Sequence, residues 1–282
     1  MDSGIASTAR HRWANHFSAL GLFVGLTDFG QLERRISDLA TRQERGDAFE
    51  VFAEAYLATQ KINQAAEVWP DGSVPISIIT SLKLPPKDMG VDGVYRTLDK
   101  GYAAYQVKFR TGRKSQTWSE LSKFIGLADR ADLKVLFTNS DEVLDVVSER
   151  RDFFCIRGAD LDRLTEDDLA VIEKWLRGTV LSPKPKTPYP HQAEALIAIL
   201  TGLEDHDRVT SVMACGTGKT LTALWLAERR KAQRILVLVP SLALIRQTLH
   251  EWLKETRWVH PRFLAVCSDP VDFHAEVSRI DG

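Results

Sequence analysis

The stretch VDGVYRTLDKGYAAYQVKFR, which spans Val91–Arg110, decides the fold predicted for the first half of the chain. Two strand-like runs, VDGVYR and YAAYQVKFR, flank the tripeptide DKG at 99–101, whose glycine suits a turn position with positive φ. The pattern predicts an antiparallel hairpin in which Leu98 and Tyr102 pair across a three-residue turn.

This register brings three polar side chains together. Counting outward from the turn places Asp92 opposite Lys108, and directly opposed residues share one face of an antiparallel pair. Side chains alternate along a strand, so Gln106 lies on the same face as Lys108. We therefore expect a carboxylate, an amide and an ammonium group to converge on one patch of sheet, provided that the turn has the predicted length.

The segments around the hairpin predict a mixed α/β sheet covered by helices. Strands are expected at 76–82, 133–139 and 153–157, and helices at 45–60, 117–130, 140–151 and 161–178, the last with Thr165 as a cap. The first helix has an apolar stripe that consists of Phe49, Phe52, Ala53, Tyr56 and Leu57. Glu50 and Glu54 flank this stripe and, four residues apart, are neighbours on the helix surface.

The second half of the chain has a different pattern. The proline-rich segment LSPKPKTPYP begins at Leu181 and indicates a linker at 181–188. Beyond it, apolar strand-like runs (VTSVMA, RILVLVP, FLAVCSD) alternate with helical ones, which predicts an incomplete parallel α/β domain of the RecA type. We expect an N-terminal helical segment at 1–45, the mixed-sheet domain at 46–180 and the RecA-like portion at 189–282.

The segment MACGTGKT, Met213–Thr220, lies between a predicted strand and a helix, which is the context of a phosphate-binding loop. Its glycines would let backbone N–H groups approach phosphate, at a helix N-terminus that favours negative charge. The expected nucleotide ligands are Gly216, Thr217, Gly218, Lys219 and Thr220, with the lysine on the β/γ-phosphates and the last threonine in the Mg²⁺ shell. The loop departs from the strict pattern at Met213, where glycine is usual.

This loop, the upstream PYPHQAEAL and the downstream LVPSLALIRQTLHEW resemble the first motifs of superfamily 2 helicases and translocases. The resemblance spans Lys186–Asp269 and implies that Gln192 recognises adenine and that VPSLALIRQ contacts the DNA backbone. The family's acidic and arginine-bearing later motifs are not in the chain. We therefore expect no ATP hydrolysis or translocation by this chain, although nucleotide binding is compatible with it.

Asp92, the Gln106/Lys108 pair and an upstream helical glutamate resemble the PD-(D/E)XK nucleases, in the QxK form of their Mrr-type branch. The resemblance implies a restriction-endonuclease-like mixed sheet with flanking helices. It also implies that Asp92, Gln106 and the Val107 carbonyl hold Mg²⁺ or Mn²⁺ and that Lys108 positions water or stabilises the charge on phosphate. Glu50 is the preferred helical acid. Glu54 and Asp88 are second candidates.

The order nuclease, linker and helicase motor resembles the N-terminal part of type ISP restriction enzymes. That resemblance implies double-stranded DNA as the substrate and ATP as a cofactor of the full-length motor. It also implies that the rest of the motor, a methyltransferase domain and a target-recognition domain follow in a complete protein.

The composition excludes several other classes. The 282 residues are 44% hydrophobic and 27% charged with a net charge of −1, as in ordinary globular proteins. No apolar run is long enough to cross a bilayer, and no signal peptide is evident, so we expect a cytoplasmic protein without a membrane partner. Three scattered cysteines argue against a disulfide framework, and the histidines show no metal-ligand spacing.

Three alternatives stay open at this point. The first half could be a nuclease fold that only binds DNA, or an accessory domain of a stand-alone helicase. A nuclease in repair or recombination is also compatible with these residues. Taken singly, Asp92 and Lys108 could be ordinary strand residues, and the two glutamates could be the solvated flank of a helix.

Overall fold

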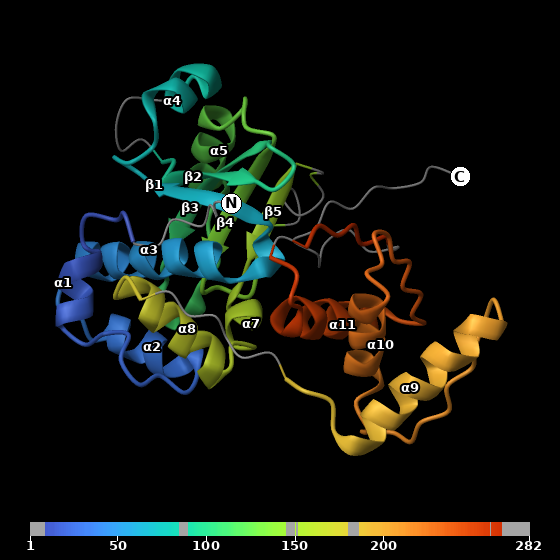
Figure 1. Ribbon diagram of the computed structural model, residues 1–282. Helices are drawn as coiled ribbons and strands as arrows, with labels where there is room; N and C mark the ends of the chain where they lie inside the picture. The colour runs from blue at the N-terminus through green and yellow to red at the C-terminus, as the bar shows by residue number, and fades with distance from the viewer. Residues whose placement is uncertain are drawn as a thin grey trace. The chain divides into compact units, whose positions relative to one another are not determined.

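The computed structural model describes residues 9–84, 90–144, 150, 152–179, 186–259 and 261–266. The chain divides into two compact units (Figure 1). The first comprises Met1–Ser182 and Arg262–Gly282, and the second comprises Pro183–Pro261. The boundary between Ser182 and Pro183 lies inside the predicted linker, and the N-terminal 45 residues belong to the first unit.

The first unit is built on one mixed sheet of five strands in the order β1-β2-β3-β4-β5. The two pairs β1–β2 and β2–β3 are antiparallel, whereas β3–β4 and β4–β5 are parallel. The predicted α/β class with a mixed sheet is therefore confirmed. The strands are β1 (Ala65–Pro70), β2 (Gly93–Thr97), β3 (Tyr102–Lys108), β4 (Leu133–Thr138) and β5 (Phe153–Ile156).

Helices cover both faces of this sheet (Figure 1). The helices are α1 (Ala14–Ala19), α2 (Phe29–Ser37), α3 (Arg42–Thr59), α4 (Ile76–Leu82), α5 (Trp118–Leu127), α7 (Gly158–Leu161) and α8 (Glu166–Leu176), with short 3₁₀ turns η1 (Lys61–Asn63) and η2 (Thr111–Arg113). Tyr105 and Val107 of β3 are buried in one core with α3, while Ala104 packs with Phe124 of α5 in another. The alternation of side chains along β3 thus separates the two cores.

Helix α3 contributes most to the larger core. Every member of its predicted apolar stripe is buried, which confirms that prediction. The rings of Phe49 and Phe52 stack with a centroid distance of 6.1 Å, and the ring of Phe137 on β4 lies 5.1 Å from that of Phe49. These contacts fix α3 across the sheet, and with it the position of Glu50 and Glu54.

The hairpin is confirmed, but its register differs from the prediction by two residues. Gly93 pairs with Tyr105 and Arg96 with Tyr102. The loop is closed by the Thr97 N–H, which donates to the Gly101 carbonyl at 2.9 Å. The positive φ expected at Gly101 is found instead at Lys100, with φ 71°. Asp92 is therefore not opposite Lys108, as the predicted turn required.

Other elements of the first unit also differ from prediction. The run at 76–82 is helix α4, which begins after Pro75 and packs Ile78 and Leu82 against Trp69 and Val94. Its isoleucines resemble a strand in the sequence because β-branched residues favour strands, but packing on β1 and β2 favours the helix. The real strand at this edge is β1, where no strand was predicted.

The last two predicted helices of the first unit have mixed outcomes. Half of the predicted helix 140–151 lies outside the described residues, and its described part, 140–144 and 150, is not helical. The helix expected at 161–178 begins only at Glu166. The Thr165 hydroxyl caps it by accepting the Asp168 N–H, as predicted.

The second unit contains the predicted helices without the predicted strands. Helices α9 (Pro190–Asp205), α10 (Lys219–Arg229) and α11 (Leu242–Glu255) lie where the sequence places them. The runs 209–214 and 234–240, predicted as buried strands, have no strand assignment and expose apolar side chains, Val212 to 92%. A strand needs a hydrogen-bonded neighbour, and the described residues of this unit provide none. The run 263–269 has no strand in its described part.

No helix in the described ranges combines the length and the apolar character that crossing a membrane requires.

Candidate functional site

Asp92 lies immediately before β2 and is bonded to β3 through both its backbone and its side chain. Its N–H donates to the Tyr105 carbonyl at 2.9 Å. Its Oδ2 accepts the Val107 N–H at 2.6 Å. The carboxylate is therefore held beside the backbone of β3 at Val107, between Gln106 and Lys108 in the sequence.

Gln106 is buried, with 2% of its surface exposed. Its Nε2 donates to the Gly90 carbonyl at 2.8 Å, whereas its Oε1 has no hydrogen-bond partner among the described residues. A buried polar atom without a partner lowers the stability of a fold. Its presence therefore calls for an explanation, such as a bound ion. Carbonyl oxygens are among the hard donors that Mg²⁺ accepts, so this oxygen fits the predicted metal ligand.

Lys108 is the last residue of β3 and is half-buried. Its carbonyl accepts the Thr138 hydroxyl at 2.9 Å, and the Gln116 side-chain amide in turn donates to that hydroxyl at 2.7 Å. Within the described part of the chain, the Lys108 ammonium forms no ion pair. The end of β3 is thus supported by β4 and Gln116, and no carboxylate of the described residues neutralises the charge of Lys108.

The structure distinguishes between the two glutamates of α3. Glu54 is buried, and its carboxylate accepts the backbone N–H groups of Arg10 at 2.7 Å and of His11 at 3.0 Å. Burial raises the pKa of Glu54, and the two N–H bonds oppose that rise. Glu50 has 26% of its side chain exposed and accepts a hydrogen bond from the His11 ring. Glu54 therefore holds the N-terminal segment, whereas Glu50 keeps access to solvent. Asp88 lies outside the described residues.

The hydroxyl of Tyr105 is under the electrostatic influence of the α3 acids and of Asp92. It is buried without a hydrogen-bond partner among the described residues. Burial raises its pKa well above the usual value, and Glu54, Asp92 and Glu50 raise it further in that order.

These acids do not form a ready-made metal cage. Across the described ranges, no three His, Cys, Asp or Glu side chains are grouped so that they could hold a metal ion. Asp92 is the only acid among the predicted metal ligands, which are completed by Gln106 and the Val107 carbonyl. A cation there would therefore depend on amide, carbonyl and water oxygens as much as on carboxylate.

Two residues near this site were not predicted. The Arg10 guanidinium pairs with Glu67 at 2.7 Å and lies over the Trp69 ring, while the His11 Nε2 lies 3.2 Å from Glu50. The N-terminal segment showed no recognisable chemistry in the sequence. Its contacts join residues separated by 39 to 58 positions, so no local pattern could have indicated them.

The phosphate-binding loop of the second unit has the expected backbone. Gly216 and Gly218 adopt φ of 78° and 79°, and Gly218 is the residue from which α10 begins. The Lys219 Nζ turns back over the loop and donates to the Ala214 carbonyl at 2.9 Å. The Trp252 indole donates to the Thr220 carbonyl at 2.9 Å, so α11 supports the first turn of α10.

Gln192 of α9 is bonded directly to this loop. Its Nε2 donates to the Thr217 carbonyl at 2.9 Å, and its Oε1 accepts the Tyr189 N–H at 2.8 Å. A Cβ added to Gly218 would lie 2.3 Å from the Gln192 Nε2. The upstream glutamine and the loop glycine are therefore packed as one structural element, which joins the two motifs that the sequence suggested separately.

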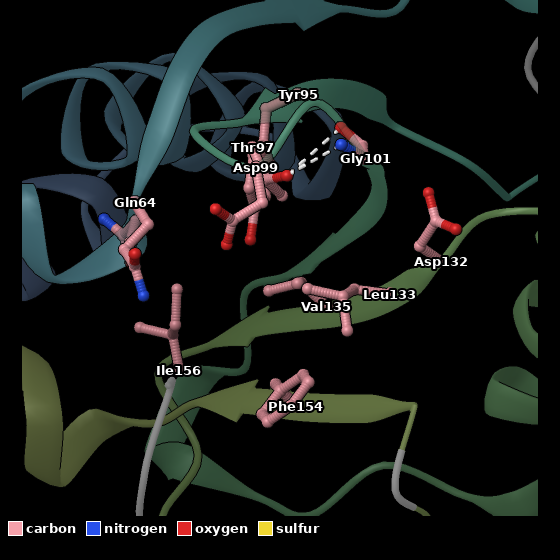
Figure 2. A pocket seen from close by; sticks show the side chains of 11 residues that line it. Gln64, Tyr95, Thr97, Asp99, Gly101, Asp132, Leu133, Val135, Phe154 and Ile156 are labelled. Carbon is pink, nitrogen blue, oxygen red and sulfur yellow. Dashed lines mark hydrogen bonds between the residues drawn. The ribbon is translucent and has the colours of Figure 1, made fainter. Parts of the chain in front are cut away.

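A cavity of about 270 Å³ lies elsewhere in the first unit (Figure 2). Val135 and Ile156 provide apolar walls, and the Asp99 carboxylate points into the space between Gln64 and Thr97. None of the predicted site residues is among those that line it. The candidate nuclease residues are thus spatially separate from this cavity.

Comparisons with known proteins found similarity to a protein family and to a solved structure. A family model described as "Type III restriction enzyme, res subunit" matches residues 185–265. The fold is similar to that of the ATP-dependent Type ISP restriction-modification enzyme LlaBIII bound to DNA, with a TM-score of 0.60 and 22% identity. That likeness covers 82% of this chain and 15% of the LlaBIII chain. No curated protein sequence matches.

Residues 185–265 are therefore similar to the res subunit of Type III restriction enzymes, and the fold of the chain is similar to part of a Type ISP restriction-modification enzyme. It spans about a seventh of that larger protein, in line with the 15% coverage.

Proposed function

We propose that this chain is the Mg²⁺-dependent DNA endonuclease part of an ATP-dependent restriction enzyme of the type ISP kind, joined to the first part of its translocase motor. In this proposal, residues 46–180 form the Mrr-type nuclease domain, 1–45 pack on it, and 189–282 begin the motor. The observation that supports it best is the buried Gln106 Oε1, which has no hydrogen-bond partner among the described residues and lies next in sequence to Val107, whose N–H binds Asp92.

The donor set suits a hard divalent cation. Asp92 offers a carboxylate, Gln106 an amide oxygen and Val107 a backbone carbonyl, and Mg²⁺ or Mn²⁺ accepts such oxygen ligands together with water. Bound there, Mg²⁺ would supply a Lewis acid that lowers the pKa of a coordinated water and neutralises charge on phosphate.

The remaining residues act on the substrate or on that water. Lys108 carries an ammonium that no carboxylate neutralises within the described residues, so it can stabilise the negative charge that develops on the phosphodiester. The Glu50 side chain is partly exposed, so its carboxylate can accept a hydrogen bond from a water molecule at the site. The backbone of β3, supported by Thr138 and Gln116, keeps Gln106 and Lys108 at a fixed spacing.

The second unit would bind ATP through Gln192, Gly216, Thr217, Gly218, Lys219 and Thr220. Lys219 has its ammonium over the loop carbonyls, where the phosphate groups of a nucleotide would contact it. Coupling of ATP hydrolysis to DNA movement would require the remaining motor motifs of the full-length protein, which would also provide methylation and target recognition.

Plasmid cleavage tests the nuclease. Supercoiled DNA is incubated with the protein in Mg²⁺ or Mn²⁺, with and without ATP, and nicked and linear products are quantified. Asp92→Ala and Lys108→Ala are expected to abolish cutting, whereas Asp129→Ala and Lys174→Ala make the same changes of charge at exposed positions and are expected to leave it unchanged.

The outcomes separate the alternatives. Cutting that survives both active-site substitutions would refute this assignment of residues. DNA binding without cutting, in this chain and in a chain with the whole motor and ATP, would favour a non-catalytic DNA-binding module. Function that survives the removal of residues 1–180 and does not need Lys108 would favour a helicase with an accessory N-terminal domain.

A further inference from the structure

The segment 9–13 passes beside Glu50 and Glu54 and is held there by α3. Glu54 accepts the backbone N–H groups of Arg10 and His11 through its two carboxylate oxygens. The Arg10 guanidinium donates to Glu67 at 2.7 Å and to the Val68 carbonyl at 3.3 Å, both on β1. Because the helix and the sheet both bind this short segment, its side chains have defined positions.

The hydrogen bonds of His11 determine which ring nitrogen carries the proton. Its Nδ1 accepts the Trp13 N–H at 3.3 Å, so in the neutral ring the proton is on Nε2. That Nε2 lies 3.2 Å from the Glu50 Oε2 and donates to it. The ring is buried, whereas the Glu50 carboxylate that it contacts is partly exposed.

We propose that His11 is a positioning residue of the nuclease site, which orients the Glu50 carboxylate through its Nε2–H. This inference rests on the proposed nuclease function. A partly exposed glutamate on a helix samples several rotamers, and a fixed donor on one of its oxygens restricts that freedom. Groups that orient catalytic or ligating carboxylates in this way contribute strongly to metal affinity and rate.

The arrangement assigns different tasks to the two glutamates of α3. Glu54 binds the backbone of the N-terminal segment, and that segment presents His11 to Glu50. The two acids are one helical turn apart, so they face the same segment. The N-terminal segment thus becomes part of the site, although it contains neither a predicted ligand nor a predicted catalytic group.

Three substitutions test this role in the full chain. His11→Ala removes the donor, and His11→Phe keeps a ring without it. His11→Gln provides an amide Nε2–H at a similar distance from the backbone. His16→Ala is the matched control, because His16 is an exposed histidine of α1, the helix that follows the segment. Each variant is measured for Mn²⁺ binding by electron paramagnetic resonance, for plasmid cleavage and for melting temperature. The ¹⁵N shifts of the His11 ring report its tautomer without metal.

We expect His11→Ala and His11→Phe to weaken Mn²⁺ binding and cleavage by about tenfold or more, the size seen when second-layer partners of ligands are removed. His11→Gln should stay within about threefold of wild type, and His16→Ala should not differ from it. The wild-type ring should have its proton on Nε2, and Glu50→Gln should shift that resonance.

Other results would overturn the inference in distinguishable ways. Wild-type cleavage and Mn²⁺ binding in His11→Ala would refute the positioning role and leave the nuclease assignment intact. Equal losses in His11→Ala and His11→Gln, together with a lower melting temperature, would show a purely structural histidine. A wild-type protein that neither binds Mn²⁺ nor cuts DNA would refute the proposed function and this inference with it.

Discussion

The phenol ring of Tyr105 lies against the Cα of Gly93, its cross-strand partner. A Cβ at position 93 would lie 2.3 Å from the Tyr105 Cζ and Oη and 2.5 Å from the Trp69 carbonyl oxygen. Real Cβ atoms do not approach other atoms so closely. Neither neighbour can easily move, because Tyr105 is fully buried and the Trp69 carbonyl belongs to the backbone of β1.

Gly93→Ala should therefore destabilise the first unit by about 2–4 kcal/mol, the range of severe overpacking in a core. Urea unfolding followed by circular dichroism measures the change. Gly126→Ala is the matched control in α5, where an added Cβ meets nothing within 4 Å. There we expect a gain of about 0.5–1 kcal/mol, since alanine favours helix over glycine. Equal effects at both positions would contradict the close contact.

Removal of the Tyr105 hydroxyl, unlike Gly93→Ala, should not lower the stability of the first unit. This group is buried and has no hydrogen-bond partner among the described residues, so it contributes a desolvation cost without a compensating bond. Tyr105→Phe is expected to leave the free energy of unfolding unchanged or to raise it by about 1 kcal/mol. A clear loss of stability in urea unfolding would show that the hydroxyl has a bonded partner.

Lys134 and Asp152 form a pair in which the lysine side chain is 3% exposed and the aspartate 37%. Burial acts to raise the pKa of Asp152, but the bonds from Lys134 and Arg150 outweigh it and lower the pKa overall. The ionised aspartate therefore stabilises the fold at pH values above the ordinary aspartate pKa of about 3.9, and this stabilisation is lost as the pH falls through the lower folded-state pKa.

Asp152→Asn leaves the buried Lys134 charge without its partner. We expect a loss of about 1–2 kcal/mol at pH 7, less than for a fully buried pair because the aspartate is partly exposed. The difference between wild type and variant should shrink below about pH 4. Urea unfolding at several pH values measures both, with the exposed Asp129→Asn as the control. A difference that does not change with pH would contradict the ion pair.

The cysteines offer a test of nucleotide binding. Burial raises the pKa of Cys155 to about 12, whereas Cys215 is exposed within the phosphate-binding loop. Thiolates react with alkylating reagents and thiols do not. In a Cys267→Ser background, Cys215 should react with N-ethylmaleimide at neutral pH, while Cys155 should react only after unfolding.

ATP should slow the alkylation of Cys215, since phosphate groups bound to the loop would cover it. Lys219→Ala should remove this protection without changing the rate in the absence of ATP. Mass spectrometry of labelled peptides gives both rates. If ATP has no effect on the wild-type chain, nucleotide binding requires the rest of the motor.

The sequence by itself determined the features that depend on a few neighbouring residues. The hairpin around 99–101, the Thr165 cap and the glycine loop before α10 were all predictable. Turn residues, capping hydroxyls and glycines act over three or four positions, so their patterns survive in any tertiary context. The apolar stripe of α3 was equally clear, because its periodicity indicates the buried face.

Only the tertiary structure decided the relationships between distant segments. The two-residue change in hairpin register depends on which residue of the loop takes a positive φ, and Lys100 does so in place of the glycine. The run at 76–82 becomes a helix because β1 and β2 offer an apolar surface to pack on. The tasks of Glu50 and Glu54 are separated by Arg10 and His11, whose bonds span about forty residues. Such contacts depend on the packing of whole elements, which no local pattern specifies.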